Sequence, residues 1–184
     1  MPNELEACAI TGAGSVEEAV ARLAAQVRCA VVVTRGAEGA VYAANGAGGA
    51  PNGAGGAPLV AVAPTVAVVD TCGAGDAFKA GFLARHVAGA PPASCLAYGT
   101  LTGAMSVGRR GGASDPPTPA QVLAFAAATG CYVAARTASG LRGPQIASAA
   151  VCSVLNARLS ATRSARAHRF YRLPGLCAKL PGLL

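Results

Sequence analysis

The sequence lacks tryptophan and has few other aromatic residues, with four phenylalanines and four tyrosines among 184 residues. Hydrophobic residues nevertheless make up 53% of the chain, and many of them are alanine. A core of small aliphatic side chains is therefore expected. Glycine, proline or charge interrupts every apolar stretch before the roughly 18 residues of a bilayer span. The residues after Met1 do not resemble a signal peptide, so a cytoplasmic location is expected.

Acidic residues are absent after Asp115. Residues 1–128 carry seven basic and eight acidic residues, net −1, whereas residues 129–184 carry eight basic residues and no acidic one, net +8. The front of the chain is therefore predicted to be one domain, followed by a basic tail, partly helical or disordered. Part of this tail could form a basic amphipathic helix that contacts nucleic acid or a membrane. A solvated extension is favoured, because its arginines are diffuse and its aromatic residues few.

The seven cysteines are scattered along the chain without close pairing. Several lie within apolar runs, which favours buried thiols in a reducing compartment over a disulfide scaffold or a zinc site.

Helical and extended patterns alternate along the chain. A strand and its hairpin partner are expected within residues 29–44, more extended sequence over 59–70, and helices at 14–27, 76–87, 94–107 and 118–128. Phe78, Phe82 and Leu83 are candidate core residues. The alternation predicts a layered α/β fold with a mostly parallel sheet. The repeated NGAGGAP at 45–58 has nothing to bury and predicts a flexible insertion.

The stretch VVDTCGAGDAFKAGF, residues 68–82, places a glycine-rich turn before a helix. The first N–H groups of a helix lack partners within it and attract phosphate. Gly73, Ala74 and Gly75 would leave these groups accessible as an anion hole, and Asp76 could accept a proton from an attacking hydroxyl. This pattern indicates phosphoryl transfer. The alternative is that Asp76 only stabilises the start of its helix.

The segment DTCGAGDAFKAGFL resembles the second signature of the PfkB (ribokinase-like) family of carbohydrate and nucleoside kinases. PNELEA resembles the family's N-x-x-E motif, VVVTRGAEGA its T-x-G turn, and GTLTGAMSVGRRGGASDPPTPAQVLAF its late helix, loop and final helix. The resemblance covers roughly residues 2–127. It implies a ribokinase-like three-layer α/β/α sandwich that is truncated, with the N-terminal half of the sheet and the lid absent.

The resemblance also implies a role for each matching residue. Asp76 would be the catalytic base and Gly73, Ala74 and Gly75 the anion hole. Asn3 and Glu6 would support hydrated Mg²⁺. The residues expected beside ATP are Thr34, Gly36, Asp70, Thr71 and Thr100, the last of which stands where many members have asparagine. In potassium-activated members K⁺ would lie near Asp70 and the backbone around Gly111.

These observations predict a kinase that transfers the γ-phosphate of ATP to a hydroxyl of a sugar or nucleoside. The DTxGAGD motif does not choose among such substrates, and self-association into a homodimer is left open. A second hypothesis is a non-catalytic fragment or pseudokinase that binds a partner through an exposed sheet edge. A third, an adaptor that acts through the tail, rests on charge alone.

Overall fold

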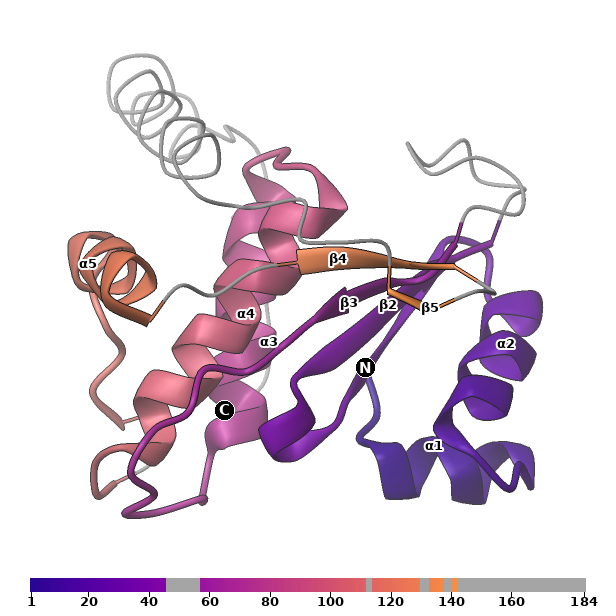
Figure 1. The fold of residues 1–184 in the computed structure, drawn as a ribbon, viewed down its shortest axis with the longest axis horizontal. Helices are drawn as coiled ribbons and strands as arrows, with labels where there is room; N and C mark the ends of the chain where they lie inside the picture. The colour runs from indigo at the N-terminus through magenta and orange to yellow at the C-terminus, as the bar shows by residue number, and fades with distance from the viewer. Residues whose placement is uncertain (46–56, 112–113, 130–132, 138–139, 142–184) are drawn as a thin grey trace, which may run out of the picture.

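A computed structural model of the chain describes residues 1–45, 57–111, 114–129, 133–137 and 140–141. The predicted insertion at 45–58 and the predicted tail from 129 fall largely outside these residues. Figure 1 shows the elements in chain order: α1 (Glu4–Thr11), α2 (Val16–Gln26), β1 (Ala30–Thr34), the 3₁₀ helix η1 (Gly36–Glu38), β2 (Ala40–Ala44), β3 (Leu59–Ala61), α3 (Ala74–Val87), α4 (Pro92–Val107), α5 (Pro119–Thr129), β4 (Val133–Thr137) and β5 (Gly140–Leu141).

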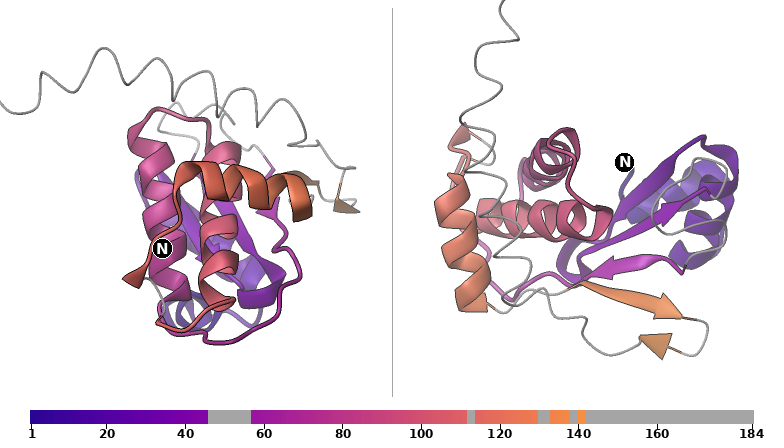
Figure 2. Two further views of the ribbon diagram at one scale, coloured as in Figure 1. Left: turned by 90° about the vertical axis from the view of Figure 1, so that its left-hand side faces the viewer. Right: turned by 90° about the horizontal axis from the view of Figure 1, so that it is seen from above.

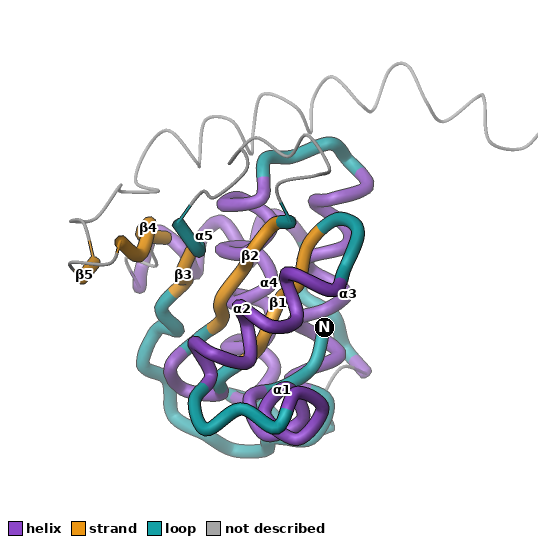
Figure 3. The backbone as a smooth tube through the Cα atoms, turned by 90° about the vertical axis from the view of Figure 1, so that its right-hand side faces the viewer, coloured by secondary structure: helices purple, strands orange, loops and turns teal. Residues whose placement is uncertain are grey.

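The five strands form one sheet in the order β1-β2-β3-β4-β5, and the strands lie side by side in Figure 3. Every paired strand is antiparallel, so the prediction of a mostly parallel sheet is wrong for the described residues. The turn that contains η1 is too short for a crossover, and a tight turn joins antiparallel strands. The predicted hairpin within 29–44 is confirmed, whereas only Leu59–Ala61 of the 59–70 stretch is a strand.

The sheet separates two layers of helices. Val31, Val33 and Val41 pack with α1 and α2 on one face, whereas Val32 and Tyr42 pack with α3 and α4 on the other. This follows from the period of two, by which successive side chains on a strand point to opposite faces. The view from above in Figure 2 shows the layers, with α5 on the outer side of α4. The three-layer α/β/α arrangement is thus confirmed for the described residues.

The predicted starts of α2 and α5 are confirmed by their caps. Ser15 Oγ accepts from the Glu18 N–H at 3.2 Å, and the Glu18 carboxylate accepts from the Gly14 N–H at 3.1 Å. Thr118 Oγ1 accepts from the Gln121 N–H at 3.3 Å, and the Gln121 side chain accepts in return from the Thr118 N–H at 2.7 Å. Both helices therefore begin where a side chain replaces the missing backbone acceptors.

Helices α3 and α4 pack closely through small residues. An added Cβ on Gly81 would overlap the Thr102 side chain, and one on Gly99 would lie 2.9 Å from the Phe78 carbonyl oxygen. This proximity lets Thr102 Oγ1 approach the Ala77 carbonyl oxygen at 2.9 Å. The pair is thus held by backbone proximity and an interhelical hydrogen bond as well as by apolar contact.

Aromatic residues of α3 face the sheet. Phe78 and Phe82 are buried, as predicted, but Leu83 is 47% exposed and the prediction for it is wrong. Each residue turns the helix by about 100°, which carries Leu83 out of the stripe that its neighbour occupies.

The four cysteines within the described residues, Cys8, Cys29, Cys72 and Cys95, are all free. Cys95 is buried, and this burial raises the pKa of its thiol to about 11 although Arg85 acts in the opposite direction. Cys29 and Cys72 are exposed, so the expectation of buried thiols holds for Cys95 and not for them.

Helices long and apolar enough to cross a bilayer do not occur in the described part of the chain.

Candidate functional site

Helix α3 begins at a glycine without any side-chain cap. The N-cap is Gly73, at φ 75° and ψ 0°, a left-handed conformation that other residues rarely adopt. The Ala74 N–H donates to the Thr71 carbonyl at 3.3 Å. Among the described residues, the N–H groups of Gly75 and Asp76 have no backbone acceptor. The helix start therefore offers two amides and the positive end of the helix dipole to an anion.

Asp76 lies in the same first turn, with its side chain 77% exposed. Its Oδ1 lies 3.6 Å from Lys79 Nζ, one turn further along α3. A pair as exposed as this adds little to stability. The carboxylate is therefore accessible to a substrate hydroxyl, although it also fits the alternative role of a first-turn acid that favours its helix.

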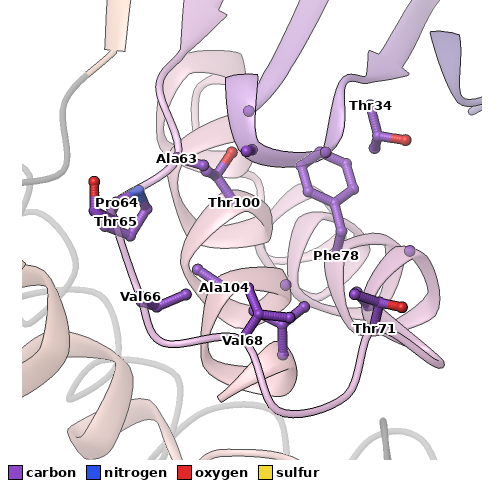
Figure 4. Close-up of a pocket in the computed structure, with 17 residues that line it drawn as sticks. Thr34, Ala63, Pro64, Thr65, Val66, Val68, Thr71, Phe78, Thr100 and Ala104 are labelled. Carbon is purple, nitrogen blue, oxygen red and sulfur yellow. The ribbon is translucent and has the colours of Figure 1, made fainter.

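A cavity of about 520 Å³ opens between the end of β1, the η1 turn, the segment 63–71 and helices α3 and α4. In the view of Figure 4, Thr34 and Thr71 lie on one side of it and Pro64 and Thr65 on the opposite side. Most of the lining is apolar, and its residues are Thr34, Gly36, Ala37, Gly39, Ala63, Pro64, Thr65, Val66, Val68, Thr71, Ala74, Gly75, Phe78, Thr100, Gly103, Ala104 and Val107.

Six of the predicted site residues line this cavity, namely Thr34, Gly36, Thr71, Ala74, Gly75 and Thr100. Gly73 and Asp76 adjoin the lining residues in sequence without belonging to them. Thr100 is buried, and its hydroxyl donates to the Leu96 carbonyl at 2.9 Å. Its oxygen can therefore accept a hydrogen bond from a ligand, but its proton is already used.

Asp70 anchors the loop that leads into α3. Its Oδ1 accepts from the Cys72 N–H at 2.9 Å, and its Oδ2 accepts from the Gly111 N–H at 3.3 Å. The backbone N–H groups of Val69 and Asp70 both donate to the Val107 carbonyl, at 2.8 and 3.2 Å. The structure thus brings Asp70 to the backbone at Gly111, and holds the glycine-rich turn against the end of α4.

Asn3 and Glu6 form a capping box at the start of α1, a helix that the sequence analysis did not predict. Asn3 Oδ1 accepts from the Glu6 N–H at 2.8 Å, and Glu6 Oε2 accepts from the Asn3 N–H at 2.9 Å. The Thr34 N–H donates to the Pro2 carbonyl at 3.1 Å, and Asn3 forms a parallel bridge with Thr34. The pair therefore lies beside a cavity-lining residue, although neither member lines the cavity itself.

Arg35 was missed by the sequence analysis and joins two parts of this region. Its Nε lies 3.5 Å from Glu4 Oε2, and its Nη2 pairs with Glu38 in η1. Helix α1 and the cavity-lining turn are thereby linked through one largely buried guanidinium. The sequence TRGAE shows Arg35 close to Glu38, which could have suggested that ion pair. The pair with Glu4 could not be foreseen, because Glu4 is distant in sequence.

The segment 63–68 was also missed as part of the site. It reads as extended sequence, yet it runs past the sheet and lines the cavity. Pro64 was the available signal, because proline cannot donate to a strand ladder and marks the end of pairing.

Residues 1–119 match the family described as pfkB family carbohydrate kinase. The chain belongs to this family. The match spans both the capping box at Asn3 and the glycine-rich turn at Gly73, so it covers the parts from which the site is built.

Two curated relatives match shorter stretches. The acarbose 7(IV)-phosphotransferase of Actinoplanes sp. is 59% identical over 44 residues, which are 24% of this chain and 15% of that protein. The ATP-dependent ribose-1-phosphate kinase of Halopiger xanaduensis is 45% identical over 60 residues, 33% of this chain and 20% of that protein.

Solved sugar kinases share the fold. The ribokinase of Arabidopsis thaliana, complexed with ribose and ATP, is 28% identical with a TM-score of 0.57, over 67% of this chain and 39% of that one. A ribokinase II from E. coli, in complex with ATP and Mg²⁺, is 26% identical with a TM-score of 0.58, over 68% and 37%. The chain thus spans well under half the length of the solved structures it matches.

Proposed function

We propose that the protein takes part in the transfer of the γ-phosphate of ATP to a hydroxyl group of a sugar or nucleoside. One observation carries the proposal: uncapped N–H groups at the start of α3 border a cavity, with an exposed carboxylate in the same turn. Family membership supports it, since sugar kinases with ATP and Mg²⁺ share the fold.

Each part of the site has a distinct task in this proposal. The amides of Gly75 and Asp76 bind phosphate oxygens and stabilise the charge that develops on them during transfer. The Asp76 carboxylate takes the proton of the acceptor hydroxyl. The nucleotide occupies the apolar cavity, with Thr34 on one side and Thr100 on the α4 wall.

Magnesium suits the oxygen atoms at the start of α1. One carboxylate oxygen of Glu6 is used by the cap, and the other can face a hydrated ion, which Mg²⁺ tolerates because it keeps several waters. When bound, the ion would neutralise phosphate charge. A K⁺ ion beside Asp70 and Gly111 stays a prediction.

A second function is favoured by a groove of about 850 Å³ along β1. Its lining combines strand residues with exposed Ile10 of α1 and Leu83 of α3. An apolar groove at a sheet edge suits β-strand addition by a protein partner, the role proposed for a non-catalytic chain.

The decisive experiment measures ATP turnover with a panel of sugars and nucleosides, and Mg·ATP binding by calorimetry, for wild type and Asp76→Asn. Loss of a general base is expected to lower turnover by about 10²- to 10⁴-fold, with the affinity for ATP largely kept. Glu18→Gln is the matched control, because Glu18 is also a first-turn acid paired with a basic residue, Arg22.

Equal turnover in wild type and Asp76→Asn would remove Asp76 from its role. Binding of ATP without turnover in the wild type would favour the non-catalytic function, and absence of both would overturn the nucleotide site.

A further inference from the structure

Strand β1 is the outermost strand of the sheet, with β2 on one side and a groove of about 850 Å³ on the other (Figure 3). We call this groove the β1 groove. The Thr34 N–H points away from β2 and donates to the Pro2 carbonyl at 3.1 Å. Alternate residues of a strand direct their backbone groups to the same side, so the N–H and C=O groups of Ala30 and Val32 also point away from β2. These groups have no ladder partner among the described residues.

The first residues of the chain show which direction a neighbouring strand takes along this edge. Asn3 forms a parallel bridge with Thr34, and Met1 and Pro2 line the β1 groove. A strand that continues this pairing runs parallel to β1 and has its C-terminal end beside Met1. Antiparallel pairing with β1 of a second copy is disfavoured, because the chain's own first residues already occupy the edge at Thr34 in each copy.

The β1 groove has an apolar wall on each side of the sheet. One wall belongs to the layer of α1 and α2 and the other to α3, and their residues are Ile10, Leu23 and Val27 on the first and Phe82, Leu83 and His86 on the second. Ile10 is 67% exposed and Leu83 is 47% exposed, so each wall presents apolar surface to solvent. Successive side chains of a strand point to opposite faces, and a strand covered on both faces is apolar on both.

We propose that the β1 groove binds an extended apolar segment of a partner protein as a further strand, parallel to β1, with its C-terminal end beside Met1. Backbone bonds with Ala30 and Val32 hold the segment, and the two walls select apolar side chains on both of its faces. Among the described residues that line the groove, none has a carboxylate, ammonium or guanidinium side chain, so a charge at the centre of the segment is disfavoured. The proposal rests on strand addition, the second function above, and not on phosphate transfer.

The peptide Ac-Lys-Val-Ile-Val-Leu-Val-Lys-NH₂ serves as the probe for the full chain, with a lysine at each end against self-aggregation. Titration followed by ¹H–¹⁵N NMR is expected to show saturable shifts along β1. A nitroxide spin label on the C-terminal lysine should broaden the Asn3 and Thr34 signals most, and one on the N-terminal lysine the Cys29 signal. Glutamate in place of the central valine should weaken binding at least about tenfold, because its carboxylate would lie against an apolar wall.

Lysine substitutions on the two walls have matched controls on the same helices. Leu83→Lys and Ile10→Lys should each weaken the peptide at least about tenfold, because each places a charge in the groove. Val87→Lys and Leu5→Lys should bind the peptide as the wild type does. Val87 and Leu5 are exposed apolar residues of α3 and α1, at 79% and 82%, and neither lines the groove. All four positions are exposed, so the fold should be kept.

The possible outcomes separate this proposal from the functions proposed above. Antiparallel broadening by the spin labels would overturn the direction and leave strand addition standing, whereas absence of saturation would remove both. Equal weakening by Val87→Lys and Leu83→Lys would also overturn the proposal. Self-association of the wild type that Leu83→Lys abolishes, measured by sedimentation equilibrium, would assign the groove to a second copy instead. ATP turnover should be the same in Leu83→Lys and the wild type, so phosphate transfer is tested independently.

Discussion

Helices α1 and α3 differ in whether side chains of the protein bond the first N–H groups of the helix. Every helix begins with N–H groups that lack acceptors one turn earlier. At α1 the side chains of Asn3 and Glu6 supply those acceptors from within the chain. At α3 the cap is Gly73, which has no side chain to supply any. The first arrangement serves stability, and the second leaves binding capacity for a ligand.

Gly75→Ala gives the largest effect expected on the affinity for ATP and sharpens this contrast. A Cβ at Gly75 meets nothing within 4 Å, and alanine is favoured over glycine in a helix, so stability should rise by up to about 1 kcal/mol. The same Cβ tilts toward the helix N-terminus, where phosphate would bind. The affinity for Mg·ATP should therefore fall at least about tenfold, roughly 1.4 kcal/mol. Thermal unfolding and calorimetry measure the two effects; an unchanged affinity would contradict the assignment.

Asn3→Ala addresses the self-capped start of α1. Loss of the cap should lower the free energy of unfolding by about 1 kcal/mol, as measured by urea denaturation. Ser15→Ala removes the comparable cap of α2 and should cost a similar amount. Only Asn3→Ala should also weaken ATP binding, because loss of the cap loosens the start of α1, where the backbone at Asn3 pairs with cavity-lining Thr34. Equal effects of both variants on binding would show that α1 is merely structural.

Glu6→Gln separates the cap from a role in holding magnesium. Glutamine keeps an oxygen that can accept from the Asn3 N–H, so stability should change by less than about 0.5 kcal/mol. A carboxylate is lost, however, and the Mg²⁺ concentration needed for half-maximal ATP binding should rise. A stability loss without any change in Mg²⁺ dependence would assign Glu6 to the cap alone.

Chemical modification of Cys72 tests the accessibility of the start of α3 without any substitution, and its expected effect is the smallest of the four. It is exposed and should react with iodoacetamide under native conditions, more slowly when Mg·ATP is present. Cys95 should stay unmodified until the protein unfolds, because it is buried and its raised pKa, about 11, keeps it as a thiol near neutral pH. Mass spectrometry of the digested protein distinguishes the sites, and modification of Cys95 first would contradict this order.

Local chemistry made the helices and the glycine-rich turn predictable. Ser15 and Thr118 cap the helices that follow them, and Phe78 and Phe82 repeat at the helical spacing that buries them. The spacing of Asn3 and Glu6 is also that of a capping box, so the start of α1 could have been predicted in the same way. The family resemblance implied a magnesium site at these two residues instead.

Contacts between distant residues were not predictable in this way. The direction of strand pairing depends on how the chain turns after Thr34, and alternation of elements alone suggested the wrong direction. Asp70 was expected near Gly111 only through the family resemblance, and local chemistry gave no sign of the bond between them. The ion pair between Arg35 and Glu4 links residues whose proximity exists only after folding. Segment 63–68 became part of the site for the same reason.

Helix α4 contributes a wall to two cavities: the first is the one beside the start of α3, and the second, on the opposite side of the helix, lies between α3, α4 and the loop 115–119. The carbonyl at the end of α4 fixes the loop before α3. A sideways shift of this helix away from one cavity and toward the other would widen the first and narrow the second. If ATP occupies the first cavity as proposed and favours one position of α4, any compound that favours the same position would raise the affinity for ATP by the factor by which ATP raises the affinity for that compound.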